Sequence, residues 1–351
     1  MLCFIPILAA ITLQDIVAKH VAALGGADMI HAIHSFVKRG WYREGSFQID
    51  TYTAQMRPFY RVIGDPIAHR LDQIHEGYDG SAWEFYPDPG IVVRTVGDAA
   101  RATRHTAVFD DPLIDYQADR TTLALGDTAN FNGHDVYTIH ATLEDSFKED
   151  LLVDQQTFMI DGRWQIVPMH AFGARLNTYD VYEDYRPEGG VMFAHRDREV
   201  DSNSGKVLDE GGVTSMEINP TLDMTIFSPP DWQRTPLQTM IARIYDERED
   251  PGAVVTTYRQ FRDLIDPSTL TGDAVDFVGY QCLKMGHANT AVSLLTLNVA
   301  DNPRSARAHF GLGRALQTSG DVSAAKREYE RSLAIDPTYS KARDALAALH
   351  S

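Results

Sequence analysis

Cysteine is nearly absent from this sequence. Only Cys3 and Cys282 occur among the 351 residues, so at most one disulfide is available, and none remains if a leader that carries Cys3 is removed. A disulfide framework like that of small secreted domains is therefore not expected. A hydrophobic content of 44% and an aromatic content of 10% predict a packed apolar core, in a chain long enough for two domains.

Positive charge is also scarce. The chain has 32 lysine and arginine residues against 49 aspartate and glutamate residues, and its net charge is -17. From Arg234 onward the basic and acidic residues number 14 each, which leaves 18 basic against 35 acidic residues before it. The acidity therefore belongs to the N-terminal part. An acidic surface repels phosphate backbones, so nucleic acid is not expected as a partner.

Long hydrophobic runs are missing as well. The most apolar stretch, residues 1–12, is too short to cross a bilayer, so we predict no integral membrane segment. It resembles the apolar core and small-residue end of a secretion signal without the usual basic residues. We interpret it as a truncated export signal; the alternatives are a buried first strand or a start codon placed too late. Cys3 follows no lipobox, so lipid attachment is not expected.

Motifs of common enzymes are absent. The chain has no Gly-x-Ser-x-Gly elbow and no Walker or dinucleotide fingerprint. Ser35 and Lys38 match a Ser-x-x-Lys spacing, but the companion elements of penicillin-binding enzymes are missing. His31 and His34 form a single pair, whereas a metal site needs three or four ligands. The acidic pair at 110–111 is interpreted as a solvated turn. We therefore predict no catalytic residue, no cofactor and no metal.

A repeated pattern is the clearest positive signal in the chain. The pairs that recur 34 residues apart are Gly279 and Gly313, Gly286 and Gly320, Ala291 and Ala325, and Pro303 and Pro337. This pattern resembles the tetratricopeptide repeat (TPR). In that family a helix–turn–helix unit carries small residues where its helices cross, and a proline ends the second helix.

The remaining C-terminal segments fit a short array of such units. Residues 237–247 and 253–264 resemble a degenerate third helix pair, and residues 340–350 form an amphipathic helix that would cap the stack. Stacked helix pairs form a concave groove that takes a peptide or a partner helix. We expect His309 and Arg314 to face this groove and bind a protein partner, although Arg314 is equally consistent with a plain surface residue.

The N-terminal part shows a different periodicity. Leu13–Leu24 has apolar residues at helical spacing and ends at Gly25-Gly26. Short β-rich runs follow, separated by turn residues such as Asp79-Gly80. The predicted strands are 36–42, 47–56, 59–63, 70–76, 83–86, 91–95, 135–143, 148–154, 157–160, 164–170, 176–185, 191–200 and 213–218, with a helical interruption at 98–105. This spacing predicts one antiparallel sheet that curls on itself. The proline-rich residues 219–232 are interpreted as a linker.

Several segments of residues 13–230 resemble the periplasmic lipoprotein-sorting carriers of Gram-negative bacteria, the LolA/LolB type. The matching segments are the opening helix with Gly25-Gly26, 78–83, 181–187, 190–193, Asn219-Pro220 and Phe227-Ser228. The resemblance implies an incomplete antiparallel β-barrel with a helical lid around an apolar cavity for acyl chains, and a periplasmic location. It also implies an arginine that links barrel and lid. Arg43 and Arg57 are candidates by region, and the alternative for both is a solvated surface charge.

Three aromatic residues are candidates for the cavity lining: Trp41, Phe85 and Phe193. The alternative is that they simply fill the core. The predicted fold class is α+β, with a possible truncated signal at 1–12, a carrier-like β half-barrel at 13–233 and an all-α TPR superhelix at 234–351. The predicted function is a non-enzymatic exported protein that sequesters an apolar ligand, such as an acyl chain, a lipid or a lipoprotein, and docks a partner. The alternatives are a scaffold with a filled barrel or, less favoured, a hydrolase with an unrecognised site.

Overall fold

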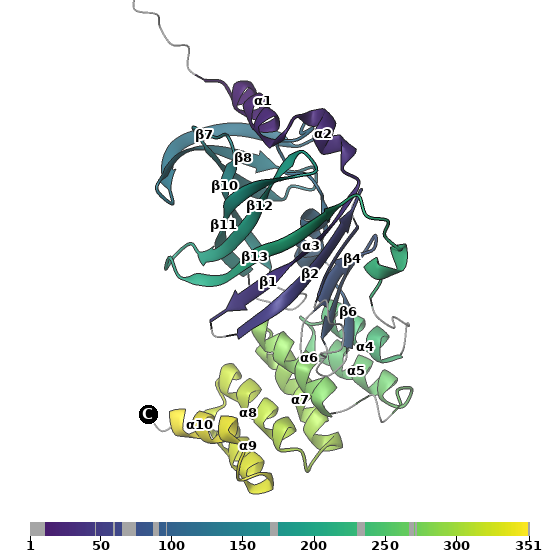
Figure 1. The fold of residues 1–351 in the computed structure, drawn as a ribbon. Helices are drawn as coiled ribbons and strands as arrows, with labels where there is room; N and C mark the ends of the chain where they lie inside the picture. The colour runs from purple at the N-terminus through teal and green to yellow at the C-terminus, as the bar shows by residue number, and fades with distance from the viewer. Residues whose placement is uncertain are drawn as a thin grey trace, which may run out of the picture.

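The computed structural model describes residues 11–349, except 46, 59, 65–74, 87–90, 96, 169–174, 230–235, 267–269 and 271. Within this part the strands form a single antiparallel sheet, ordered β6-β5-β4-β3-β2-β1-β13-β12-β11-β10-β9-β8-β7. The strands are β1 Ser35–Glu44, β2 Phe47–Met56, β3 Tyr60–Gly64, β4 His75–Tyr78, β5 Ala82–Tyr86, β6 Ile91–Arg94, β7 Thr122–Phe131, β8 His134–Thr142, β9 Lys148–Asp154, β10 Ile160–Pro168, β11 Arg175–Glu188, β12 Val191–Asp201 and β13 Val207–Ile218. The sheet is strongly curved and is not closed into a barrel (Figure 1). The α+β class is confirmed.

The first strand pairs with the last, and this pairing joins two meanders into one sheet. Strands β1 to β6 follow one another outward on one side, and β13 back to β7 on the other. At the junction, Asn219 has a left-handed φ of 54°. Its Oδ1 accepts hydrogen bonds from the amides of His34 (2.7 Å) and Ser35 (3.3 Å), and its Nδ2 donates to the Ala32 carbonyl (3.0 Å). The junction is therefore held by a side chain as well as by the ladder.

Two helices cover one end of the curved sheet. Helix α1, Leu13–Leu24, begins with a capping box between Thr12 and Asp15 and ends at Gly25. Gly25 has a φ of +124°, and a Cβ there would lie 2.3 Å from the Gly190 carbonyl oxygen, so only glycine fits. Helix α2, Ala27–Ala32, follows directly. The predicted first helix is thus confirmed at both ends.

Helix α3, Gly97–Ala107, contacts strands on both sides of the curve, β3 to β5 on one arm and β10 on the other. It lies between the two arms of the sheet (Figure 1). The predicted helical interruption at 98–105 is confirmed, and its position limits the depth of the hollow.

The C-terminal part is helical throughout its described residues. Its helices are α4 Pro236–Asp246, α5 Pro251–Arg262, α6 Gly272–Lys284, α7 Ala288–Asp301, α8 Ala306–Ser319, α9 Val322–Ile335 and α10 Ser340–Ala348. Helix α4 contacts α5, α5 contacts α7, and each helix from α6 to α9 contacts the next, while α6 also contacts α8. The repeated residues serve these contacts: a Cβ on Gly279 would collide with Leu295, and one on Gly313 with Tyr329. This part lies at the opposite end of the sheet from α1 and α2 (Figure 1).

The two parts share an apolar cluster. Val93 of β6 is buried together with Met240, Ile241 and Ile244 of α4 and residues of α5 to α7. The predicted linker at 219–232 is also not a free connection. It contains a short 3-10 helix, Met224–Phe227, and Phe227 is fully buried, with its carbonyl accepting a hydrogen bond from the Trp83 indole at 2.8 Å.

The strand prediction was wrong in two places. Strand β7 was missed, although Asn132-Gly133 between β7 and β8 is a strong hairpin signal, with φ angles of 51° and 89°. Residues 157–160 are not a separate strand, because most of this segment belongs to the turn that leads into β10. The predicted strand at 70–76 lies mostly outside the described residues, as does the apolar stretch 1–10. Among the described helices, none combines the length and apolarity that a membrane span requires.

We predict that Asn219→Ala lowers the free energy of unfolding by about 1–2 kcal/mol, because it removes three hydrogen bonds and places alanine in a left-handed conformation. Chemical denaturation measures the change. Asn203→Ala, in the exposed β12–β13 turn, is the matched control and should shift stability by less than about 0.5 kcal/mol. Equal stabilities for both variants would contradict the role given to Asn219.

Candidate functional site

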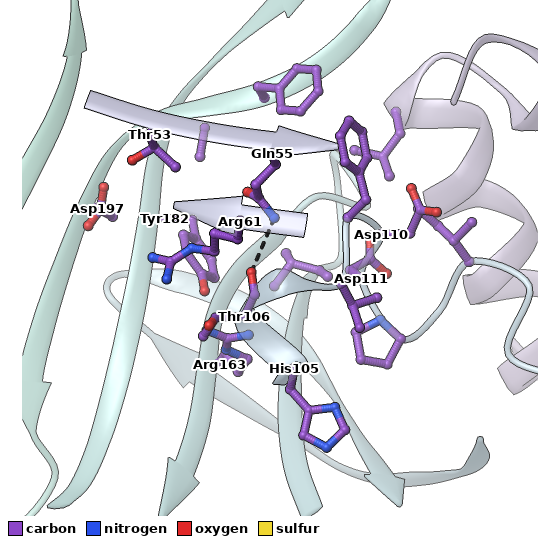
Figure 2. Close-up of a pocket in the computed structure, with 18 of the residues that line it drawn as sticks. Thr53, Gln55, Arg61, His105, Thr106, Asp110, Asp111, Arg163, Tyr182 and Asp197 are labelled. Atoms are coloured by element: carbon purple, nitrogen blue, oxygen red, sulfur yellow. Dashed lines mark hydrogen bonds between the residues drawn. The ribbon is translucent and has the colours of Figure 1, made fainter. Parts of the chain in front are cut away.

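A cavity of about 1070 Å3 lies inside the curve of the sheet. Its wall is formed by β1 to β3, β9 to β13, α1 to α3 and the segment 108–121. Ligand pockets typically measure about 300–1000 Å3, so this volume is that of a large binding site. Figure 2 shows its two sides, with Asp197, Arg61 and Tyr182 on one and Asp110 and Asp111 on the other.

The side of the cavity beneath α1 and α2 is apolar. The residues that both line it and belong to one hydrophobic cluster are Leu24, Ile30, Ile33, Phe109, Ile114, Val191, Met192 and Phe193. Phe36 adds an aromatic contact, with its ring centroid 4.7 Å from that of Phe109 and 5.7 Å from that of Phe193. This half offers a surface for an apolar chain.

The opposite side carries a closed network of charges. The Arg163 guanidinium donates to Asp180 Oδ2 at 2.7 and 3.1 Å and lies 3.7 Å from Glu149. Gln165 and Tyr182 donate to the same Asp180 oxygen, at 3.1 and 3.3 Å. Burial raises the pKa of Glu149 and of Tyr182, although Arg163 opposes both shifts. These groups satisfy one another, so they form a rigid polar wall.

Lys38 and Asp197 stand apart from this network. Both line the cavity, but within the described residues Lys38 has no carboxylate oxygen within 4.0 Å. The Lys38 ammonium lies 4.9 Å from the centroid of the Phe36 ring and 5.5 Å from that of Phe193. Burial lowers the pKa of Lys38 and raises that of Asp197, and each charge partly offsets the shift of the other. The ammonium therefore sits where the apolar side meets the polar side.

Arg57 fastens the end of β2 to helix α2. Helices α1 and α2, which cover this end of the sheet, are called the lid below. Arg57 forms a two-pronged ion pair with Asp110, with Nη2 at 2.7 Å from Oδ1. Its guanidinium also donates to the carbonyls of Ile33 (2.8 Å) and Ile30 (3.2 Å), at the C-terminal end of α2. The pair is mostly buried, with side-chain exposures of 25% and 17%. Arg57 is therefore not a solvated surface charge.

A second carboxylate of the same segment holds α1. His20 is buried, and its Nε2 lies 3.0 Å from Asp111 Oδ2 while its Nδ1 lies 2.7 Å from the Phe158 carbonyl oxygen. Burial alone would lower the pKa of His20, but Asp111 and this carbonyl outweigh it and leave the pKa raised. Both ring nitrogens face acceptors, which favours the protonated ring. The interpretation of residues 110–111 as a solvated turn was wrong, because both carboxylates are engaged.

The three predicted lining residues are placed differently. Phe193 lines the apolar side. Trp41 is also at the cavity wall, but strand alternation puts its side chain on the opposite face of β1 from Lys38. Its indole lies against Gly212 and Arg43 there. Phe85, on β5, is not among the described residues that line the cavity.

The other predicted residues are placed as follows. Arg43 pairs with Glu210 on the neighbouring strand β13 and is 45% exposed, as expected of a surface charge. Ser35 donates to the Pro220 carbonyl at 2.9 Å. Strand alternation also points Ser35 and Lys38 to opposite faces of β1, so they cannot act as a catalytic pair.

In the helical part, His309 is buried, and its ring nitrogens lie 2.6 Å from Glu328 and 3.1 Å from the Pro303 carbonyl. Its hydrogen-bonding capacity is used within the chain, so His309 is unavailable to a partner. Arg314 is half-buried, with its guanidinium 4.4 Å from the centroid of the Tyr280 ring and 5.7 Å from that of Phe310.

One cluster outside the cavity has metal-ligand geometry. His134, Asp154 and Asp161 bring one ligand atom each within 4.8 Å of one another. His134 Nδ1 lies 2.5 Å from Asp161, and one oxygen of Asp154 binds the amides of Gln156 and Thr157. These partners satisfy the groups without an ion. We therefore give this cluster no role in binding.

The residues that sequence reasoning missed are Lys38, Asp197, Arg61 and Arg163. Each is a charged residue within a β-run, at a position that alternates onto the inner face. The strand register shows which side chains share a face. Gln55 lies opposite Arg61, and Arg163 lies opposite Asp180, so each of these two pairs points to the same side of the sheet. A charged residue at an inward-facing position of a predicted strand was the sequence signal that could have identified these lining residues.

We predict that Arg57→Met lowers the free energy of unfolding by about 2–3 kcal/mol, because it leaves Asp110 partly buried without its partner. Arg43→Met is the matched control, since an exposed pair contributes about 1 kcal/mol or less. Denaturant titration of both variants measures the difference. A smaller loss for Arg57→Met than for Arg43→Met would contradict the anchoring role.

Acid–base behaviour gives a second prediction. Burial and the adjacent carboxylate of Glu199 raise the pKa of Asp209 to about 7, while its ordinary value is 3.8. Between these values the folded state keeps a proton that the unfolded state has lost, so this group lowers stability as pH rises from about 4 through 7. Asp209→Asn should stabilise the protein by about 1–2 kcal/mol at pH 8 and by little at pH 4, with exposed Asp50→Asn as the control. A gain that does not depend on pH would refute this.

The comparisons with known proteins give low-identity matches to solved structures. No protein-family model matches the chain, and no curated protein matches it in sequence. The chain is similar to a DUF1329 family protein from Desulfovibrio piger ATCC 29098 (11% identity, 63% of this chain and 99% of that chain, TM-score 0.44). It is also similar to the LolA superfamily protein NE2245 from Nitrosomonas europaea (18% identity, 63% of this chain and 99% of that chain, TM-score 0.41). A third match is a putative outer membrane lipoprotein-sorting protein domain from Vibrio parahaemolyticus (11% identity, 61% of this chain and 95% of that chain, TM-score 0.40). Likenesses at this level do not identify a ligand.

Proposed function

We propose that this chain is a non-enzymatic binding protein that holds the apolar chain of a ligand inside its curved sheet. The observation that carries the proposal is the cavity of about 1070 Å3 with an apolar half beneath α1 and α2. Each methylene moved from water into this half contributes roughly 0.8 kcal/mol. A chain of ordinary acyl length would therefore be held without any covalent step.

The anchoring of the lid supports this proposal. Arg57 and His20 tie α2 and α1 to the segment that carries Asp110 and Asp111. These contacts hold the helices over the hollow, so its apolar lining is shielded from water while the space beneath remains. A scaffold with a filled barrel, the first alternative, would instead place side chains in that space.

The hydrolase alternative finds less support. The described lining residues include His20, His105 and several aspartates. They include no serine or cysteine, and within the described residues no hydrogen bond joins a lining hydroxyl to a lining histidine, so no activated nucleophile supports this alternative.

The helical part is proposed to dock a protein partner as a short TPR-like array at residues 234–351. The surface that supports this is built from Arg314, Tyr280, Phe310 and Tyr339, with the Phe310 and Tyr339 ring centroids 5.4 Å apart. Aromatic and arginine residues dominate the energetics of protein interfaces. We also propose residues 13–233 as the ligand-binding domain and the periplasm of a Gram-negative bacterium as its location, from the resemblance described for the sequence.

The ligand proposal predicts that the full chain binds a fluorescent apolar probe such as N-phenyl-1-naphthylamine. Phe193→Ala should weaken this binding about 10-fold, which is 1.4 kcal/mol, because it removes part of the apolar wall. Phe85→Ala is the control and should bind within about 2-fold of the original chain. Fluorescence titration measures the affinities, and circular dichroism checks that both variants fold.

Two results would count against the proposed function. One is no fluorescence change with the unmodified chain, which would leave the interaction scaffold as the better account. The other is equal weakening by both variants, which would show that the probe binds elsewhere.

A further inference from the structure

Most charged side chains that line the cavity form ion pairs within the described residues. Those that form none are candidates for binding a ligand. The pairs are Arg61 with Glu76, Arg120 with Glu144, His105 with Asp145, His20 with Asp111, and Arg163 with Asp180. Lys38 and Asp197 line the same cavity with no ion pair to each other at 4.0 Å or less, and within the described residues neither makes a side-chain hydrogen bond. The half-buried Lys38 ammonium and the exposed Asp197 carboxylate therefore face the cavity with charges that a ligand could pair with.

The position of Lys38 links this space to the apolar half. Its ammonium lies over the rings of Phe36 and Phe193, and Phe193 belongs to the apolar cluster beneath α1 and α2. Asp197 lies four residues further along β12, on the same face as Phe193. Along β12 the lining therefore passes from aromatic to acidic, with the Lys38 cation at the boundary.

We propose that the ligand is a single-chain amphiphile with a zwitterionic head, whose anionic group binds Lys38 and whose ammonium binds Asp197. This rests on the proposed function, because the tail occupies the apolar half described there. The two unpaired charges are opposite in sign and more than 4.0 Å apart, so a head that carries both charges in the reverse order satisfies each of them.

The surrounding charges favour a zwitterion over a plain anion. Arg61 adds a second cation near Lys38, and its charge acts to lower the pKa of the lysine. Beyond Asp197, however, Glu199 and Asp209 continue the negative side of the sheet, and they pair across β12 and β13. A purely anionic head would leave Asp197 without a partner and would face this negative potential. An uncharged ligand would leave both Lys38 and Asp197 unsatisfied.

The test compares two lysolipids with the same acyl chain. Lysophosphatidylethanolamine carries a phosphate and an ammonium, and lysophosphatidylglycerol carries the phosphate alone. Each is titrated below its micelle concentration against N-phenyl-1-naphthylamine bound to the full chain. We expect the zwitterionic lipid to displace the probe with an affinity about 10-fold higher than that of the anionic lipid, the difference that one charge-assisted contact provides.

Two variants test which charge of the lipid head contacts Lys38 and which contacts Asp197. Lys38→Met should weaken both lipids about 10-fold, because it removes the contact that both phosphates use. Asp197→Asn should reverse the preference, since it weakens the zwitterionic lipid and relieves repulsion of the anionic one. Lys206→Met and Asp50→Asn, both exposed, should leave both affinities within about 2-fold. The apolar probe should bind every variant.

The outcomes separate the two proposals. If the probe binds the unmodified chain but the two lipids compete equally, the head-group site is overturned and the apolar site stands. A preference for the anionic lipid in the unmodified chain, or an unchanged preference in Asp197→Asn, overturns it as well. If the probe itself does not bind, the proposed function fails and the head-group site falls with it.

Discussion

The pairing of β1 with β13 is the constraint on which the rest of this structure depends. Without it the chain would form two separate meanders, each with an apolar face that no partner covers. Once it forms, the two meanders become one sheet that curves around a common interior. Asn219 reinforces the junction by binding the backbone at the start of β1, and its left-handed conformation turns the chain away after β13. The hollow is a consequence of this long-range pairing.

Most charged side chains inside the curved sheet are stabilised by hydrogen bonds and ion pairs to one another. Arg163, Asp180 and Glu149 lie on three neighbouring strands and satisfy one another, so their burial stabilises one arrangement of those strands. Arg57 and His20 do the same for the lid, each through one of two adjacent aspartates. Against this background the unpaired charges of Lys38 and Asp197 are unusual. The proposed ligand would supply the partners that these two charges lack in the chain itself.

Local features of this chain could be read from the sequence, and features that depend on long-range register could not. Helix α1 was predicted because its cap and its apolar spacing lie within the segment itself. Strand β7 was missed because Gly126, Asp127 and Asn130 lower its apparent β-propensity, and most of its residues are exposed. Arg57 and Arg43 both meet carboxylates far along the chain, but only the Arg57–Asp110 pair is mostly buried, whereas Arg43 stays 45% exposed beside Glu210. The volume of the cavity depends on the curvature of the whole sheet, which no single segment encodes.

An open sheet has two edge strands whose unpaired backbone groups must be protected from pairing with other chains. The helical part covers one of these edges. The β6 edge has only four residues, and Val93 in it is buried against α4. The β7 edge is longer, but a register shift between Leu125 and Thr128 interrupts it and its surface is mostly polar. The helical part is therefore attached where a short edge strand needed cover, at the end of the sheet away from the lid. A partner bound to the helical part, as proposed above, would therefore leave the lid end of the cavity unobstructed.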